Sequence, residues 1–105
     1  MSVGESTLQS IKEAIASASG SRFKGVILYG SEVRGASTDE SDIDLLALLD
    51  GPIDVWKDTR AIVGAIYPLQ LRIDRLIHVT PADANEFAKA EFSLYRNVKR
   101  EGRML

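Results

Sequence analysis

The spacing of apolar residues changes several times along the chain, and each change marks the boundary of a predicted element. Between residues 5 and 19 the apolar side chains are three or four positions apart, which predicts an amphipathic helix. Residues 23–29 (FKGVILY) form a short apolar, β-prone run, which predicts a strand that ends at Gly30. Residues 31–35 then predict a tight turn or a single helical turn, and residues 36–41 a polar loop.

Two further strands and one further helix are predicted by the same apolar runs and helical spacings. Residues 43–49 (IDLLALL) predict a second strand, and residues 53–67 predict a second helix that ends before Pro68. Residues 71–79 alternate between apolar and polar side chains, which predicts a third strand. The predicted strands are sufficient for a small sheet.

The last part of the chain predicts helices. Thr80 can cap a helix and Pro81 suits its first position, so we expect one helix over residues 81–90 and another over residues 91–100. The order of elements predicts an α/β (α+β) fold, a small mixed β-sheet with helices on one face and the other face open. A chain of 105 residues is sufficient for one core, so we expect a single domain over residues 1–105.

Composition and charge narrow the classes of protein that the chain can represent. Its 45% hydrophobic and 27% charged residues are ordinary for a globular protein. A formal net charge of −2 argues against broad, charge-driven binding of nucleic acid, and the basic residues at positions 96–103 predict a solvated helix face. The absence of cysteine excludes disulfides, thiolate nucleophiles and Cys-type zinc sites. Neither a signal peptide nor an apolar run of the ~20 residues that span a bilayer is evident, so we expect a cytoplasmic protein.

The candidate chemistry lies between residues 29 and 50. Asp42 and Asp44 are one residue apart at the start of the second predicted strand, so their side chains should project from the same face. Two like charges that close raise each other's electrostatic energy, and a divalent cation with oxygen ligands would relieve it. Asp74, on the third predicted strand, is expected on the same open face. The sequence therefore predicts a cation site at Asp42 and Asp44, with Asp74 on the same face of the sheet.

A turn followed by two carboxylates resembles a known signature. The motif Gly30-Ser31, ten intervening residues and Asp42-Ile43-Asp44 is similar to that of the polymerase-beta-like nucleotidyltransferase superfamily. The longer stretch GSEVRGASTDESDIDLL resembles the minimal nucleotidyltransferase branch, and the tail LYRNVKREGRM is similar to the closing helix and Gly turn of that branch. The branch has a third acid in an Ile/Val-Asp-apolar context, which Ile73-Asp74 resembles.

Two positions depart from the pattern of the branch. Val33 stands where a small residue is common, and Arg75 stands where an apolar residue is common. Alternation places Arg75 on the core side of the third predicted strand, so either its side chain reaches past the edge of the sheet or the register is shifted by one. His78 shares the face of Asp74 by the same alternation and is expected to be a surface residue.

The resemblance implies a polymerase-beta-like nucleotidyltransferase fold and an Mg-dependent reaction. A nucleoside monophosphate would pass from a nucleoside triphosphate, ATP, to a hydroxyl with release of pyrophosphate. Asp42, Asp44 and Asp74 would ligate two Mg²⁺ ions, or Mn²⁺ in their place, and Asp74 would also take the proton of the attacking hydroxyl. Gly30, Ser31 and Arg34 would bind the phosphates, although Arg34 suits a structural ion pair equally well.

The resemblance also implies a partner. The minimal branch includes the MntA-like antitoxins of HEPN/MNT toxin–antitoxin pairs, so we expect an antitoxin of a type VII-like pair that adenylylates a tyrosine of a HEPN-domain RNase toxin. This interpretation implies a hetero-oligomer that contacts neither nucleic acid nor membrane directly. Two alternatives are open. One is a non-catalytic nucleotide- or partner-binding module that neutralises its partner by contact. The other is an antibiotic-modifying nucleotidyltransferase, against which the lack of room for a walled pocket argues.

Overall fold

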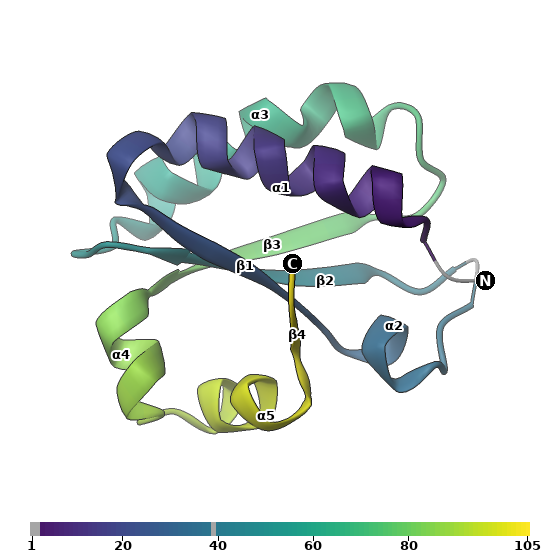
Figure 1. The fold of residues 1–105 in the computed structure, drawn as a ribbon. Coiled ribbons are helices and arrows are strands. Elements are labelled where there is room, and N and C mark those ends of the chain that lie inside the picture. The colour runs from purple at the N-terminus through teal and green to yellow at the C-terminus, as the bar shows by residue number, and fades with distance from the viewer. Residues whose placement is uncertain (1–2, 39) are drawn as a thin grey trace.

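In a computed structural model of the chain, which describes residues 3–38 and 40–105, helices cover both faces of a four-stranded sheet (Figure 1). The strand order is β3-β2-β1-β4. The strands are β1 (Phe23–Tyr29), β2 (Ile43–Leu49), β3 (Ile77–Asp83) and β4 (Arg103–Met104). Since β1 is antiparallel to β2 and β4 whereas β2 and β3 are parallel, the sheet is mixed. The predicted α/β class with a small mixed sheet is confirmed.

The first face of the sheet is covered by α1 (Glu5–Ser19) and α3 (Val55–Gln70). Both helices are amphipathic, and their apolar stripes meet alternate side chains of the strands. The fully buried members of this main core include Ile11, Ile15, Ile43, Leu45 and Ile62. Burial of one such side chain contributes roughly 1.5–3 kcal/mol, so this layer provides most of the driving force for the fold.

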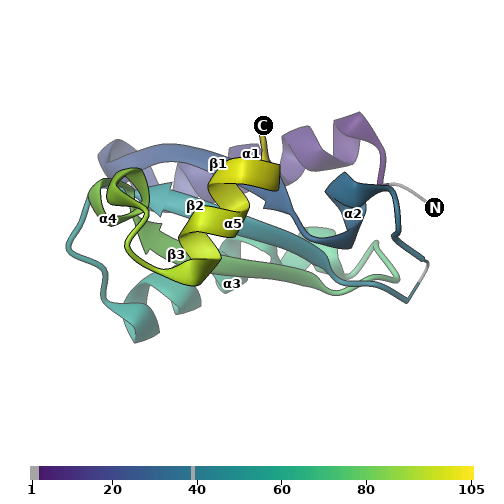
Figure 2. The same cartoon turned by 90° about the horizontal axis from the view of Figure 1, so that it is seen from below.

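The second face is partly covered as well, which the one-sided arrangement expected from the sequence did not include. Helices α4 (Ala84–Lys89) and α5 (Ser93–Glu101) lie against it, and Figure 2 shows α5 in front of the strands. A second cluster joins these helices to the sheet: Ile27, Leu46, Leu48, Ala82, Phe87 and Val98. The cause lies in β2, which is apolar on both faces beyond Asp44. The end of β2 near Asp44 remains accessible, since Asp44 is half-buried and its neighbour His78 is exposed.

Helix α3 and strand β3 have other bounds than predicted. The side chain of Gln70 sets where β3 begins. Helix α3 continues through Pro68 to Gln70. The Gln70 amide then donates to the carbonyl of Arg75 at 2.8 Å and accepts from the N–H of Ile77 at 2.7 Å. These bonds close a turn over residues 71–76, so β3 begins at Ile77 and the predicted strand start at residue 71 is wrong.

Pro81 lies in β3 and not at the start of a helix. Strand β3 is at the edge of the sheet, where a residue without an N–H removes no bond between strands if that position faces outward. The cap of the next helix is Asp83, whose carboxylate accepts from the N–H groups of Asn85 and Glu86 at 2.8 and 3.3 Å. Helix α4 therefore begins at Ala84, later than predicted.

The tail returns to the sheet as β4, an element absent from the prediction. Arg103 and Met104 pair with Leu28 and Ile27 of β1. This return requires Gly102, because a Cβ there would lie 2.4 Å from the Ile27 side chain and 2.5 Å from the carbonyl oxygen of Val98. The tail thereby ties the end of α5 to the centre of the molecule.

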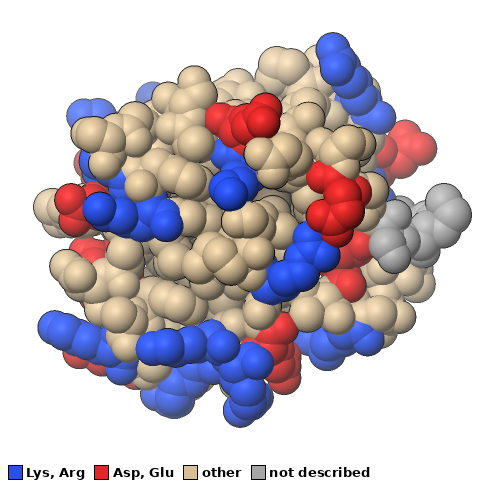
Figure 3. All heavy atoms as spheres, in the orientation of Figure 1, with Lys and Arg blue, Asp and Glu red and all other residues tan. Residues whose placement is uncertain are grey.

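Charges of both signs are interspersed on the face shown in Figure 3, with basic side chains gathered along the edge formed by α4 and α5. Part of this basic set is engaged locally. Lys99 donates to the carbonyl of Ala88 at 2.8 Å, and Arg96 donates to the carbonyls of Ala90 and Glu91 at 3.3 and 3.2 Å. These bonds hold α5 against the end of α4. None of the helices within the described part of the chain is long and apolar enough to span a bilayer.

Candidate functional site

The Gly30-Ser31 turn lies directly against the side chain of Asp44. Tyr29, the last residue of β1, is paired with Asp44 across the antiparallel ladder, so the turn that follows comes next to that carboxylate. Gly30 has φ +78° and ψ −151°, a conformation that residues with a Cβ rarely adopt. A Cβ on Gly30 would lie 2.6 Å from Asp44 Oδ2. Both the backbone conformation and the close contact therefore require glycine here.

The two paired carboxylates lie at the start of β2. Asp42 immediately precedes the strand and is exposed, whereas Asp44 is its second residue and is half-buried. Ile43 between them is fully buried in the main core, so alternation directs Asp44 to the opposite side of the sheet, whereas Asp42 lies just outside the ladder. Asp44, the half-buried Gly30-Ser31 turn beside it and the exposed Asp42 form a polar corner at the accessible end of the second face.

The third predicted carboxylate is in a turn and not on a strand. Asp74 is exposed in the segment 71–76 that precedes β3, so its predicted strand position is wrong. Within residues 3–38 and 40–105, no three acidic or histidine side chains form a group that could hold a metal ion. The structure thus brings Asp44 to the turn, with Asp42 two residues before it in the chain, and does not add Asp74 to them. The role of Asp74 as a ligand stays a prediction.

His78 occupies the place across the ladder from Asp44. The two residues are partners in the parallel register, and His78 Nδ1 lies 3.4 Å from Asp44 Oδ1. The imidazole is 57% exposed, as expected of a surface residue, yet it lies beside the candidate carboxylate. The correct start of β3 would have revealed this position, because it sets which residue of β3 faces Asp44.

Tyr29 completes the floor of the polar corner. Its hydroxyl interacts with the side chain of Thr80, so the Tyr29 side chain extends from β1 across β2 toward β3. Burial, together with the negative charge of Asp44, raises the pKa of Tyr29 above its ordinary value, although the interaction with Thr80 opposes the shift. The phenol therefore stays protonated at neutral pH and adds no charge beside the carboxylates.

The loop that leads to Asp42 is held by a buried ion pair. Arg75 Nη2 lies 2.7 Å from Glu32 Oε1, and the two side chains are only 9% and 3% exposed. Arg75 Nε also donates to the carbonyl of Ser41 at 2.8 Å, and Nη2 lies 3.5 Å from the carbonyl oxygen of Asp42. Arg75 is therefore in the turn before β3 and not on the core side of a strand, which explains its departure from an apolar pattern.

Glu32 is ionised despite its burial. Burial alone would raise its pKa, but the N–H of Val3, Arg75 and the Ser37 side chain stabilise the charged form and hold the pKa below its ordinary value. The bond from the Val3 N–H to Glu32 Oε2 is 2.6 Å long. Sequence reasoning missed the role of Glu32, since nothing in its local pattern distinguishes it from a surface acid.

Arg34 remains available to a ligand. Its guanidinium is 56% exposed and lies 3.8 Å from Glu101, a surface ion pair of a kind that contributes about 1 kcal/mol at most. Arg34 borders a pocket of about 210 Å³ between α2 (Ser31–Arg34) and α5. This pocket is lined by Tyr29, Gly30, Arg34, Leu94, Asn97, Val98 and Glu101. At 3.8 Å from Glu101 the Arg34 guanidinium is only weakly paired with that carboxylate, and its positive charge lies beside the Gly30-Ser31 turn.

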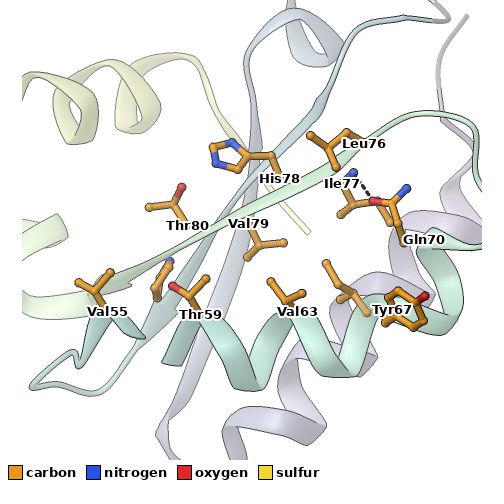
Figure 4. A pocket seen from close by; sticks show the side chains of 12 residues that line it. Val55, Thr59, Val63, Tyr67, Gln70, Leu76, Ile77, His78, Val79 and Thr80 are labelled. Carbon is orange, nitrogen blue, oxygen red and sulfur yellow. Dashed lines mark hydrogen bonds between the residues drawn. The ribbon is translucent and has the colours of Figure 1, made fainter. Parts of the chain in front are cut away.

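A larger apolar groove of about 460 Å³ runs between α3 and the edge strand β3. Figure 4 shows Val63 and Tyr67 on α3 below the strand, Val79 pointing toward the helix, and His78 on the opposite side of the strand. Val63 and Tyr67 are 49% and 57% exposed, which is unusual for apolar side chains that lie next to one another. Since His78 lines this groove and also approaches Asp44, the groove adjoins the polar corner.

The chain is similar in sequence to a known family and to a known protein. The model of the family described as the nucleotidyltransferase domain matches residues 8–104. A protein of Methanocaldococcus jannaschii, MJ0604, named as a candidate protein adenylyltransferase, is 32% identical over 102 residues, which are 96% of either chain. The similarity therefore extends over nearly the whole length of both proteins.

Solved structures share the fold at low sequence identity. A toxin–antitoxin structure with AMP-PNP has a TM-score of 0.63 at 16% identity and covers 97% of this chain and 72% of the other. A mutant of the toxin–antitoxin MntA–HpeT has a TM-score of 0.61 at 17% identity, over 98% and 72%. A candidate nucleotidyltransferase from Sulfolobus solfataricus has a TM-score of 0.53 at 23% identity, over 99% and 89%. The nucleotidyltransferase fold implied by the resemblance is confirmed.

Proposed function

The chain belongs to the nucleotidyltransferase domain family, and we propose that it transfers AMP from ATP to a hydroxyl of a protein. The observation that carries this proposal is the contact between Gly30 and Asp44, in which a carboxylate lies so close to the turn that a Cβ on Gly30 would displace it. A triphosphate on the turn would place its phosphorus atoms beside the acids. The relative that is 32% identical is named for protein adenylylation, which supports the choice of a protein acceptor.

Asp42 and Asp44 suit a divalent cation that is shared with the substrate. Mg²⁺ in proteins is commonly held by one or two carboxylates, with substrate phosphates and water as the other ligands. Two carboxylates are therefore sufficient as the protein ligands of such a site. Bound Mg²⁺ or Mn²⁺, as one or two ions, would neutralise charge on the transferred phosphoryl group. Asp74 stays the proposed third ligand, and this role requires the turn at residues 71–76 to approach the pair when substrate binds.

The residues around the turn would align the reacting groups. The backbone of Gly30 and the N–H and hydroxyl of Ser31 would contact the phosphates, and Arg34 would neutralise the outer ones. The acceptor oxygen attacks the α-phosphorus, the bond to the β-phosphate oxygen breaks, and pyrophosphate leaves with the electron pair. The proton of the acceptor hydroxyl passes to Asp74, or to water if Asp74 stays remote. Holding both reactants in line is the main contribution of the protein to such a transfer.

A HEPN-domain RNase toxin is the proposed acceptor, with a tyrosine as the modified residue. Two structural relatives are toxin–antitoxin structures, which supports a toxin as the partner and a hetero-oligomer as the assembly. The apolar groove beside His78 offers a protein a surface next to the carboxylates. ATP as the donor also implies a cytoplasmic site of action.

A second candidate function is neutralisation of the partner by contact alone. The apolar groove favours it, because exposed neighbouring side chains such as Val63 and Tyr67 are typical of partner-binding surfaces and need no chemistry to act. In that case the nucleotide site would be regulatory or without use.

Labelled ATP separates the two functions. The purified chain, Mg²⁺, ATP labelled at the α-phosphate and the product of the neighbouring gene, the proposed toxin, should give a labelled partner. Asp42→Asn and Asp44→Asn should each abolish the labelling. Asp50→Asn is the matched control, because it removes an exposed carboxylate at the other end of β2 and should leave the labelling unchanged. Neutralisation that persists in Asp44→Asn favours contact, and no labelling with either Mg²⁺ or Mn²⁺ would refute the transferase proposal.

A further inference from the structure

Two arginines hold the two ends of β2 in the same manner. After the strand, Arg22 lies 2.8 Å from the carboxylate of Asp58 on α3 and donates to the carbonyls of Asp50 and Pro52, both at 2.9 Å. Before the strand, Arg75 pairs with Glu32 on α2 and bonds the carbonyl of Ser41. Each arginine thus joins a helical carboxylate to the backbone of a loop beside β2. Only the loop before β2, which Arg75 contacts, carries a proposed metal ligand, Asp42.

The loop before β2 is closed on itself by bonds between Thr38 and Ser41, where the N–H of Thr38 donates to Ser41 Oγ at 2.9 Å and the N–H of Ser41 donates to the carbonyl of Thr38 at 3.1 Å. Arg75 ties this closed loop to the turn before β3. In the described part of residues 35–42 there is neither strand nor regular helix. The ladder with β3 begins at Ile43, whose N–H donates to the carbonyl of Leu76 at 2.8 Å. Asp44 lies inside this ladder and opposite Tyr29, so its position follows from the sheet. Asp42 lies outside the ladder, so its position depends on the loop.

Glu32 connects this loop to the phosphate side of the site. It directly follows Ser31, and its partner Arg75 lies 3.5 Å from the carbonyl oxygen of Asp42. One ion pair therefore joins the Gly30-Ser31 turn to the backbone of Asp42, which follows after ten intervening residues. Because both side chains are almost fully buried, water does not compete for the pair.

We propose that Arg75, held by Glu32, is a positioning residue that sets Asp42 against the Gly30-Ser31 turn for binding of the cation and triphosphate. The inference rests on the proposed function for the identity of those ligands. Arg75 touches neither substrate nor cation and acts through the backbone of Ser41 and Asp42. Loss of its bonds should weaken the binding of metal-nucleotide more than a comparable change elsewhere in the fold.

The test compares the two arginines. Arg75→Lys keeps a charge for Glu32 but cannot bond two backbone carbonyls and a carboxylate in one plane, and Arg22→Lys makes the same change at the far end of β2. Binding of Mn²⁺ in the presence of AMP-PNP, followed by electron paramagnetic resonance, reports the site without any turnover. Thermal unfolding of both variants reports their stability.

Arg22 is 37% exposed and Arg75 9%, so Arg75→Lys should lose more stability, and binding is therefore compared at a temperature where both variants are folded. Arg75→Lys should raise the Mn²⁺ concentration at half-saturation by roughly 10-fold or more, the scale seen when groups that support metal ligands are changed, and Arg22→Lys should leave it within about twofold. Glu32→Gln, which keeps the shape of the side chain but removes the charge that holds Arg75, should shift binding in the same direction. If Arg75→Lys does not fold, Glu32→Gln decides alone.

Equal Mn²⁺ binding in Arg75→Lys and Arg22→Lys would overturn the inference and leave Arg75 a purely structural residue. Binding by the wild-type chain separates this inference from the proposed function. A chain that binds Mn²⁺ with AMP-PNP but labels no partner contradicts AMP transfer while the role of Arg75 stands. A wild-type chain that binds no Mn²⁺ with AMP-PNP overturns both.

Discussion

Replacement of Gly30 by alanine should separate the stability of the fold from the proposed catalysis. At φ +78° and ψ −151° a residue with a Cβ is strained by roughly 1–3 kcal/mol. The added Cβ would also lie 2.6 Å from Asp44 Oδ2, whereas it would lie 3.4 Å from Cγ and 3.5 Å from Cβ of the same residue. Only the end of the Asp44 side chain has to turn away. That rotation costs little stability but moves the carboxylate from its place beside the turn.

The expected result is a moderate loss of stability with a large loss of activity. For a chain of this size each 1 kcal/mol lowers the melting temperature by roughly 4–8 °C, so the variant should remain folded at assay temperature. A displacement of about 1 Å in a catalytic group costs on the order of 100-fold in rate. Because the variant should still be folded at the assay temperature, a 100-fold loss of rate on this scale cannot be due to unfolding.

Gly35→Ala is the matched control. Gly35 also has a left-handed conformation, with φ +72° and ψ 16°, and among the described residues a Cβ there would have no neighbour within 4 Å. It should therefore lose a similar amount of stability and keep its activity. Urea unfolding gives the free energy for each variant, and transfer of labelled AMP at saturating ATP gives the rate. Wild-type activity in Gly30→Ala, or an equal loss in Gly35→Ala, would refute the reasoning.

Three further outcomes are expected. The pKa of Glu32 and that of Asp58, which Arg22 stabilises as a carboxylate, lie below their ordinary values of 4.5 and 3.8. The unfolded chain therefore binds more protons, so urea unfolding should show full stability above about pH 5 and a decline below it, less steep in Glu32→Gln. Phe87→Ala, at a buried position 5.8 Å from the Tyr95 ring, should cost about 3–5 kcal/mol in the same assay. Val63→Asp should change stability by about 0.5 kcal/mol or less but weaken calorimetric binding of the partner, and Leu71→Asp, outside the groove, should not.

The first half of the fold follows closely from the sequence. The predicted bounds 5–19, 23–29 and 43–49 coincide with α1, β1 and β2, because apolar spacing there is regular and glycine marks the ends. After residue 67 two prolines were misread. Pro68 was expected to end a helix and Pro81 to begin one, but the first lies in the last turn of α3 and the second in an edge strand. At the sheet edge Pro81 removes no bond between strands if its position faces outward, whereas Pro68 removes one helical bond near the end of α3 without ending the helix.

The wrong element boundaries after residue 67 also explain why only half of the polar corner was predicted. The Gly30-Ser31 turn and Asp44 were recognisable because one antiparallel pair of strands brings them together, and both strands were correctly bounded. Asp74 depended on a third strand whose start is set by the side chain of Gln70, a contact that apolar spacing does not encode.

Arg75 did carry a signal, because a charged residue is rarely buried without a partner, so its predicted place on the core side was itself evidence against a strand. Its pair with Glu32 also constrains Asp74. Adjacent Cα atoms are about 3.8 Å apart, so Asp74 can move only a few ångströms relative to the backbone of Arg75. If Asp74 joins the other two acids when substrate binds, either its side chain has to span the remaining gap or the buried pair has to shift with it. Asp42 would then move as well, since Arg75 bonds the carbonyl of Ser41 before it. The position of the third acid and that of the first are therefore linked through one guanidinium.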